Sequence, residues 1–359
     1  MLIGICGAKC AGKSAVAQYL IDHHGFTKLY LEQKKESQTG VPEQPSNSEA
    51  IPTTLSIHQP SATPASHTFP TATALLDFVT KSWRSRWVTT EIHTEAVLDA
   101  LSRRPFFILI SVDAPLTLRW RRHQQRSSSL SSPSSTTTAA SPPISLEDFV
   151  TQSDTHLYSP YTGAQSLISR ATIRLLNTSS SLAHLYATLG KLDLTNPDRL
   201  RPSWDSYFMS LASLAAQRSN CMKRAVGCVL VGRERRVIST GYNGTPRNLV
   251  NCGEGGCARC NSGEGSGVSL GTCLCLHAEE NALLEAGRER IREGSVLYCN
   301  TCPCLTCSIK IVQVGISEVV YSQGYSMDGE TAEVFKTAGI RLRQFSPPAN
   351  GLIHLERLE

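Results

Sequence analysis

Long apolar runs are missing from this 359-residue sequence. No stretch approaches the ~20 consecutive apolar residues that a membrane-spanning helix needs. We also expect no signal peptide, because the apolar segment Met1–Ile5 is short and is followed directly by a glycine-rich loop. Aromatic residues make up only 6% of the chain, and the net charge of +5 is not concentrated in a basic stripe. We therefore expect a soluble intracellular protein, cytoplasmic with the nucleus also open, that binds neither membranes nor nucleic acid.

Cysteine is the residue that the sequence has in excess. There are 13 cysteines, and nine of them lie between Cys252 and Cys307. Such clustering, with pairs separated by two residues, is typical of metal binding in a reducing compartment rather than of a disulfide scaffold.

The chemistry is concentrated in two short motifs. His277-Ala-Glu279 is followed, 27 residues after the histidine, by Cys304, which begins a Pro-Cys-x-x-Cys motif ending at Cys307. Zinc binds imidazole nitrogen and thiolate sulfur, and a catalytic zinc keeps its fourth position open for water. Glu279 lies where its carboxylate can reach that water without occupying the metal. This combination is typical of zinc-dependent nucleobase deaminases.

Local sequence predicts that both motifs stand at helix starts. Residues 278–286 are rich in the strong helix formers Ala, Leu and Glu. Pro303 suits the first turn of a helix, which would put Cys304 and Cys307 on one face near the positive end of its dipole. The alternatives are a purely structural zinc site and ordinary buried thiols, and Glu279 argues against both.

A second group of cysteines precedes His277. The Cys-x-x-Cys and Cys-x-Cys pairs in this glycine-rich loop have the spacing of a structural zinc site, and buried thiols are the alternative. The candidate ligands are Cys252, Cys257, Cys260, Cys273 and Cys275.

The N-terminus has the pattern of a phosphate-binding loop. Residues 2–6 form an apolar run readable as a strand, Gly7–Ser14 matches G-x-x-x-x-G-K-S, and residues 14–21 are helical in character. Backbone N–H groups between Gly7 and Gly12 would cradle phosphate, Lys13 would reach its oxygens, and Ser14 is placed to bind Mg²⁺.

The first 195 residues loosely resemble nucleoside monophosphate kinases and dephospho-coenzyme A kinase. An apolar strand at 106–112 precedes a helix that carries arginines, as in those enzymes. A second acid to support magnesium is not evident, because Glu91 and Asp113 are weak candidates. An active kinase and a degenerate kinase fold that binds a nucleotide, or nothing, both stay open.

Composition divides the chain into two α/β domains. We expect a P-loop domain at 1–195, interrupted by Ser/Thr/Pro-rich insertions near 36–73 and 127–145, and a zinc domain at 204–345. Alternating strands and helices in the second domain predict a sheet covered by helices on both faces. Residues 346–359 are expected to form a tail.

With these motifs in order, residues 204–345 resemble the deoxycytidylate deaminase family. Further matches are Arg218-Ser219, Val226-Gly227 and the motif Gly-Tyr-Asn-Gly-x-Pro that begins at Gly241. The resemblance, which is to the fungal form with its N-terminal kinase-like extension, implies a cytidine deaminase-like three-layer α/β/α fold. It implies conversion of dCMP to dUMP for dTMP synthesis, in a hexamer activated by dCTP and inhibited by dTTP. Its implied substrate-binding residues are Asn243, Gly244, Ala278 and Tyr325. Arg224 is a candidate phosphate contact on its position alone, and the alternative is a surface arginine exposed to solvent.

Other functions stay open at this point. Another zinc deaminase would act on a nucleoside, a tRNA adenosine or a pterin precursor, although the Gly-Tyr-Asn-Gly motif favours the deoxycytidylate branch. A P-loop nucleotide kinase with an accessory zinc domain is a second reading. A non-catalytic zinc scaffold and an editor of single-stranded DNA fit less well.

Overall fold

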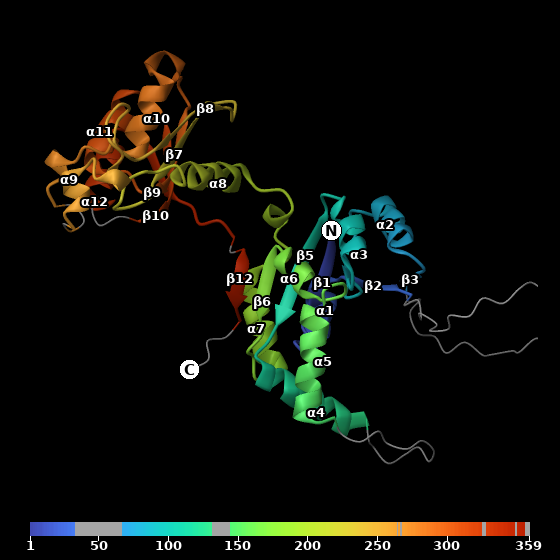
Figure 1. The fold of residues 1–359 in the computed structure, drawn as a ribbon. Helices are drawn as coiled ribbons and strands as arrows, with labels where there is room; N and C mark the ends of the chain where they lie inside the picture. Colours follow the sequence, from blue (N-terminus) through green and yellow to red (C-terminus); the bar gives the residue numbers. More distant parts are fainter. Residues whose placement is uncertain are drawn as a thin grey trace, which may run out of the picture. The chain divides into compact units, whose positions relative to one another are not determined.

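The computed structural model describes residues 1–32, 67–130, 144–263, 265, 268–324, 328–348 and 350–355 (Figure 1). These residues form two compact units. The N-terminal unit holds Met1–Asn196 together with the strand Gly351–His354, and the C-terminal unit holds Pro197–Pro348. No helix in the described ranges is long and apolar enough to cross a membrane.

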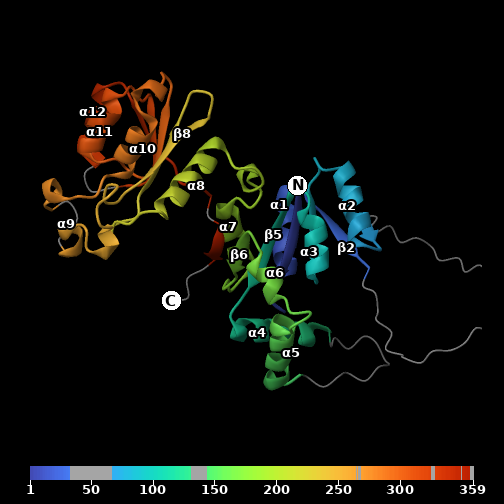
Figure 2. The same ribbon diagram turned by 45° about the horizontal axis from the view of Figure 1, so that its top comes forward.

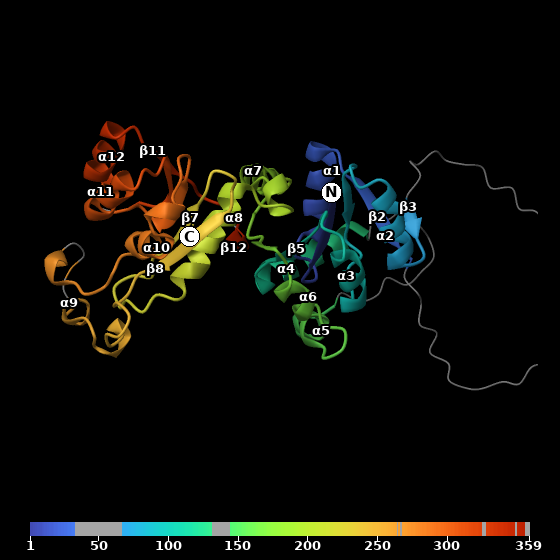
Figure 3. The same ribbon diagram turned by 90° about the horizontal axis from the view of Figure 1, so that it is seen from above.

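The N-terminal unit is a parallel sheet with helices. Its seven strands run in the order β12-β6-β5-β1-β4-β2-β3, and every neighbouring pair is parallel. Figure 3 shows β2 and β3 at one end of this sheet, beside α2. The elements are β1 (Leu2–Gly7), α1 (Lys13–His24), β2 (Thr27–Leu31), β3 (His67–Phe69), α2 (Ala72–Lys81), β4 (Trp87–Thr89), α3 (Glu95–Ser102), β5 (Phe107–Asp113), α4 (Leu116–Leu130), α5 (Leu146–Tyr158), α6 (Gln165–Ser169), β6 (Ile173–Leu176), α7 (Leu182–Leu192) and β12 (Gly351–His354).

Three boundaries differ from those expected. The insertion expected at 36–73 ends earlier, because β3 and the start of α2 lie inside it, and Thr71 caps α2 by accepting a hydrogen bond from the Ala74 N–H. The insertion expected at 127–145 is shorter, because α4 continues to Leu130 and Ser145 caps α5. Residues 36–66 and 131–143 lie outside the described residues. The expectation of a C-terminal tail was wrong, since β12 pairs with β6.

The C-terminal unit has a mixed five-stranded sheet in the order β11-β10-β9-β7-β8. Strand β7 is antiparallel to both neighbours, whereas β9, β10 and β11 are parallel. Its elements are α8 (Trp204–Ala216), β7 (Gly227–Val231), β8 (Val237–Tyr242), α9 (Ala258–Asn261), α10 (Ala278–Ala286), β9 (Val296–Thr301), α11 (Leu305–Gln313), β10 (Glu318–Gln323), α12 (Asp328–Thr337) and β11 (Arg341–Gln344), with short 3₁₀ turns at Pro197–Arg199, Cys252–Glu254, Leu270–Thr272 and Arg288–Arg290.

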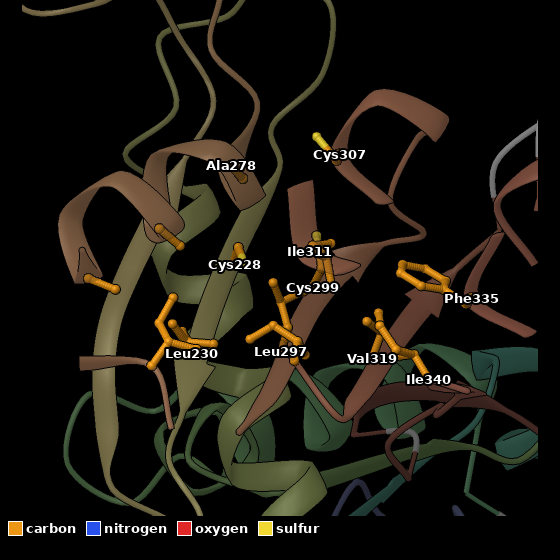
Figure 4. Packing of buried hydrophobic residues seen from close by; sticks show 14 residues of the cluster. Cys228, Leu230, Ala278, Leu297, Cys299, Cys307, Ile311, Val319, Phe335 and Ile340 are labelled. Atoms are coloured by element: carbon orange, nitrogen blue, oxygen red, sulfur yellow. The ribbon is translucent and has the colours of Figure 1, made fainter. Parts of the chain in front are cut away.

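Both faces of the inner strands of this sheet are buried. Successive side chains of a strand point to opposite faces. Leu230 of β7 accordingly packs with α10 and α11 in one cluster, and its neighbour Val229 packs with Phe208 of α8 in another. Figure 4 shows the first cluster, in which Ala278 and Cys307 come from helices above the strand side chains Leu230 and Leu297. Figure 2 shows α10, α11 and α12 gathered together. The unit therefore has the three α/β/α layers expected.

One glycine allows α10 to lie close against the sheet. A Cβ atom at Gly241 of β8 would stand 2.1 Å from the Ala278 carbonyl oxygen and 2.5 Å from the Ala282 nitrogen. Both atoms belong to the backbone of α10, so they cannot move aside as a flexible side chain would. The absence of a side chain at Gly241 thus sets the depth at which the first turn of α10 packs.

We predict that Gly241→Ala destabilises the protein by about 1–3 kcal/mol, the usual cost of overpacking a core. The measurement is the midpoint of chemical denaturation. Gly232→Ala is the matched control, because a Cβ there would meet nothing closer than the Ile238 Cδ1 at 3.5 Å. Equal stability of the two variants would contradict the packing argument.

Candidate active site

Two helix N-termini carry the metal-ligand candidates. His277 is the N-cap residue of α10, and Cys304 is the N-cap residue of α11, with Cys307 in the first turn. Pro303 therefore precedes the helix, two positions before its first residue Leu305, and is not in the first turn as expected from the sequence. Both starts lie at the positive ends of helix dipoles, which favour the thiolate form of cysteine.

The three donor atoms lie at the spacing of a zinc site. The His277 Nδ1 is 3.3 Å from the Cys304 Sγ and 3.4 Å from the Cys307 Sγ. Tetrahedral bonds of about 2.0 Å to nitrogen and 2.3 Å to sulfur would separate such atoms by roughly 3.5 Å. The donor set, one imidazole and two thiols within 4.8 Å of one another, therefore fits zinc.

The Cys304 thiol is held ready to bind a cation. Its neighbours Cys307 and His277 lower the pKa of Cys304 to about 3, against the opposing effect of burial. In the reverse direction, the hydrogen bond that the His277 ring donates to the Cys304 sulfur raises the pKa of His277 to about 9. The pair therefore favours the thiolate form of Cys304.

Glu279 stands next to this group, in the first turn of α10. Its side chain is only 4% exposed, and burial raises the pKa of its carboxyl to about 7. A carboxyl group with a pKa near neutrality can both accept and release a proton during turnover. Glu279 thus has the location and the electrostatics of a general acid–base group.

A cavity of about 200 Å³ opens in front of these residues. Its walls come from α10, the start of α11, the ends of β8 and β9, the segment after α8 and the cysteine-rich loop. The lining residues are Cys221, Lys223, Arg224, Val226, Asn243, Arg259, Cys260, Cys273, Cys275, His277, Ala278, Glu279, Thr301, Cys302 and Cys304.

Asn243 lines the cavity but already makes several hydrogen bonds. Its Oδ1 accepts from the Ser219 hydroxyl at 2.7 Å and from the Val226 N–H at 2.8 Å, while its Nδ2 donates to the Arg224 carbonyl at 2.7 Å. Because the amide nitrogen has two hydrogens, one remains to point at a ligand. The residue therefore braces the cavity wall as well as facing it.

Gly244, expected to bind substrate, has a backbone role. Its N–H donates to the Leu276 carbonyl at 3.1 Å and its carbonyl accepts from the Leu276 N–H at 2.9 Å, in an antiparallel bridge beside His277. A Cβ atom there would lie 2.3 Å from the Asn220 Oδ1. Gly244 does not line the cavity and instead holds the segment that leads into α10.

The remaining expected substrate residues divide in two. Ala278 and Arg224 line the cavity, with Ala278 fully buried and Arg224 at the rim. Tyr325 lies outside the described residues. Sequence reasoning missed Lys223 and Thr301, which line the cavity. The sequence feature that could have indicated Lys223 is its position next to Arg224, since the two form an adjacent pair of basic residues.

Comparison with known proteins decides the family. The zinc-binding region of cytidine and deoxycytidylate deaminases matches residues 202–323. The chain is 46% identical over 350 residues to the deoxycytidylate deaminase of Schizosaccharomyces pombe, covering 98% of this chain and 99% of that one. It is 43% identical over 356 residues to that of Saccharomyces cerevisiae, covering 96% and 97%. This chain belongs to the deoxycytidylate deaminase family.

The human deoxycytidylate deaminase is a more distant relative. It is 30% identical over 154 residues, which cover 42% of this chain and 84% of that one. The family assignment confirms the deaminase interpretation of the sequence and sets aside deaminases of nucleosides, tRNA adenosine and pterin precursors. It also sets aside the non-catalytic scaffold.

The deaminase carries a second cysteine group, larger than expected. All five predicted cysteines are present, and Cys221, which follows α8, joins them. Their sulfurs form two groups of four, each within 4.8 Å, namely Cys221, Cys252, Cys260 and Cys275, and Cys257, Cys260, Cys273 and Cys275. Sequence reasoning missed Cys221 because it lies 31 residues before Cys252 and in no Cys-x-x-Cys pair.

The N-terminal unit of the deaminase contains the glycine loop between β1 and α1. Gly7 and Gly12 have φ of 128° and 109°, in the region that favours glycine. The Lys13 ammonium donates to the Gly7 and Ala8 carbonyl oxygens at 2.8 and 2.9 Å. Ser14 is exposed in the first turn of α1. Lys13 is thus folded over its own loop.

Two acids flank this loop, one on each strand next to β1. Glu91 follows β4 and bonds to Thr90 and His93, and Asp113 ends β5 and accepts from the Ala114 N–H. Carboxyl ends of parallel strands meet at one edge of a sheet, so both acids lie on the side of the glycine loop. Each is already engaged in local hydrogen bonds, and neither stands out as a magnesium ligand.

Proposed function

We propose that this member of the deoxycytidylate deaminase family hydrolyses dCMP to dUMP and ammonia at the cavity in front of His277, Cys304 and Cys307. The observation that carries the proposal is the contact of these three donors, two of which, His277 and Cys304, line one cavity together with the buried Glu279. In the reaction, water adds to C4 of cytosine, the bond from C4 to the amino nitrogen breaks, and ammonia leaves.

His277, Cys304 and Cys307 would hold the catalytic zinc. When bound, zinc supplies Lewis acidity and lowers the pKa of water toward neutrality. The three side chains take up three of its four usual positions. The helix starts hold the imidazole and the thiolates in place, with His277 and Cys304 at the cavity wall.

Glu279 moves the protons. Its carboxylate takes one proton from the attacking water and delivers it to N3 of the ring. It then takes the proton of the new C4 hydroxyl and passes it to the amino group, which leaves as ammonia while a carbonyl forms at C4. Burial excludes bulk water from the carboxyl and holds its pKa near 7. This single carboxyl group therefore carries both protons that the reaction transfers.

Asn243 and the cations at the rim orient the nucleotide. The free N–H of the Asn243 amide is positioned to donate to the sugar-phosphate part of dCMP. Lys223 and Arg224 bring positive charge to the mouth of the cavity, where the 5′-phosphate would lie. Ala278 keeps the cavity floor narrow beside Glu279, and Tyr325 remains a candidate for substrate contact on resemblance alone.

The resemblance also supports the wider enzymology. We infer a homo-oligomer, hexameric in form, activated by dCTP and inhibited by dTTP, with Mg²⁺ accompanying a bound nucleoside triphosphate. The product dUMP would supply dTMP synthesis. Thirteen cysteines without a disulfide between them suit the reducing cytoplasm.

The N-terminal unit contains a second candidate binding site, separate from the zinc site. A cavity of about 400 Å³ beside the glycine loop is lined by Gly12, Arg122, Arg126, Asn177 and the N-terminal turn of α7. Arg122 donates to the Ala11 carbonyl at 3.0 Å, which places a guanidinium against the loop. We infer that this unit binds a phosphate-bearing ligand and transfers phosphate poorly, because the acid that magnesium requires is not evident.

Glu279→Gln should retain zinc and lose deamination by a factor on the order of 10²–10⁴ or more, because only the proton shuttle is removed. The measurements are ammonia release from dCMP and the zinc content of the purified variant. Glu280→Gln is the matched control, since the Glu280 carboxylate pairs with the Lys310 ammonium at 2.6 Å outside the cavity. Near-normal turnover of the Glu279 variant with zinc retained would refute the assigned role.

The unaltered enzyme should prefer dCMP over deoxycytidine by a factor of ~10⁴, since an empty phosphate site leaves its donors unpaired. The measurement is kcat/KM for each substrate.

Arg224→Ala should raise the KM for dCMP by roughly 10-fold or more, because it removes a charge-assisted hydrogen bond. It should leave turnover of deoxycytidine unchanged. Arg236→Ala, which removes an exposed arginine outside the cavity, is the control. An equal effect of Arg224→Ala on both substrates would exclude a phosphate contact.

Lys13→Ala should weaken ATP binding to the full chain by equilibrium titration, while dCMP turnover keeps its rate. Any change should appear as an altered response to dCTP or dTTP. Lys81→Ala, at the end of α2, is the control for charge. No ATP binding by the unaltered chain would overturn the phosphate site, and vigorous ATP-dependent phosphorylation of a nucleotide would overturn the inferred lack of transfer.

A further inference from the structure

Six cysteine sulfurs in the C-terminal unit form two overlapping groups of four. Cys260 and Cys275 belong to both groups. Cys221 and Cys252 complete one group, and Cys257 and Cys273 complete the other. Two four-sulfur sites that share two members have the connectivity of a cluster with two metal ions.

The sulfur spacing matches metal–thiolate tetrahedra. Four of the sulfur pairs lie 3.7–3.9 Å apart, namely Cys221–Cys260, Cys257–Cys273, Cys260–Cys273 and Cys260–Cys275. A zinc–sulfur bond of about 2.3 Å gives a tetrahedron whose sulfur–sulfur edge is roughly 3.8 Å. A disulfide would require about 2.05 Å between the sulfurs. The shared member Cys260 is close to a sulfur of each group.

We propose that these six cysteines hold two zinc ions in one cluster, with the sulfurs of Cys260 and Cys275 bridging the ions. Each ion then has four thiolate ligands, the closed coordination of a structural zinc. Cys221 and Cys252 ligate only the first ion, and Cys257 and Cys273 ligate only the second. This cluster is separate from the zinc at His277.

A single ion would leave part of the group without a function. If the ion occupied the group containing Cys221, the Cys257 and Cys273 thiols would remain 3.9 Å apart. If it occupied the other group, Cys221 and Cys252 would remain. Among the described residues of the loop, the hydrophobic cluster at this place consists of cysteines alone, so these residues offer no hydrocarbon core to hold it. Metal–thiolate bonds are therefore the cohesive interaction.

The surroundings supply charge and hydrogen bonds for the thiolates. Six thiolates and two zinc ions leave a net charge of about −2. The buried Arg259 guanidinium lies beside Cys260 and Cys273. Backbone N–H groups of Met222 and Leu274 donate to the sulfurs of Cys252 and Cys257, both at 3.4 Å. Second-shell donors of this kind are expected around thiolate-bound metal.

The cluster would join distant segments around the substrate cavity. Cys221 follows α8, and Cys275 lies two residues before His277. Cys221, Cys260, Cys273 and Cys275 also line the cavity in front of Glu279. The two ions would therefore tie the cavity wall to the start of α10.

The test is the metal content and X-ray absorption of the full-length protein, purified in reductant without chelator. We expect three zinc ions per chain, counting the one at His277, and a zinc–zinc scattering distance of roughly 3 Å, as two tetrahedra sharing an edge require. Cys221→Ser should lower the content by one ion, and Cys260→Ser should lower it by two. Cys6→Ala, in β1 of the other unit, should leave the count at three.

Two zinc ions in the unaltered chain, three without a short zinc–zinc distance, or disulfides among the six cysteines would each overturn the proposal. The measurement on the unaltered chain requires no variant to fold. His277→Ala separates this cluster from the catalytic site, since it should lose one ion and keep the zinc–zinc signal. Loss of that signal in His277→Ala would show that the short distance does not arise from the six cysteines.

Discussion

The C-terminal unit depends on bringing two helix N-termini to one point. The His277 imidazole lies 3.3–3.4 Å from the Cys304 and Cys307 sulfurs because α10 and α11 pack on the same face of the sheet. Gly241 sets how deeply α10 lies, and the bridge between Gly244 and Leu276 directs the chain into it. Packing thus determines the geometry of the donors, and a metal held by them would strengthen that packing.

Chemistry carried by neighbouring residues could be predicted from the sequence, and chemistry assembled by the fold could not. His277 and Glu279 share one helical turn, and Cys304 and Cys307 share another, so the roles proposed for them follow from their spacing. Cys221 escapes that reasoning because two strands, β7 and β8, separate it from the cysteine-rich loop. Strand β12 escaped for the same reason, since its partner β6 lies more than 170 residues earlier. Only long-range contacts reveal such pairings.

The Gly-Tyr-Asn-Gly motif shows that one motif can have structural and chemical roles together. The Asn243 side chain bonds to Ser219, Val226 and the Arg224 carbonyl, which orders the segment between α8 and β7. That segment carries the cations at the cavity mouth. A residue selected from sequence as a substrate ligand therefore also positions other candidates, and its replacement would disturb several contacts at once. Gly244 has only a structural role among the described contacts, because its N–H and its carbonyl both bond to Leu276.

The cysteine-rich loop explains how a glycine-rich wall can border a precise active site. Few apolar side chains are available between Asn251 and Cys275, and the buried cluster there consists of thiols. Burial of so little hydrocarbon cannot offset the conformational entropy of ordering the loop. Bonds from thiolates to metal are strong enough, and structural zinc contributes folding free energy directly. Since three of the loop's cysteines also line the substrate cavity, the proposed metal–thiolate bonds would fix the shape of that cavity as well as fold the loop.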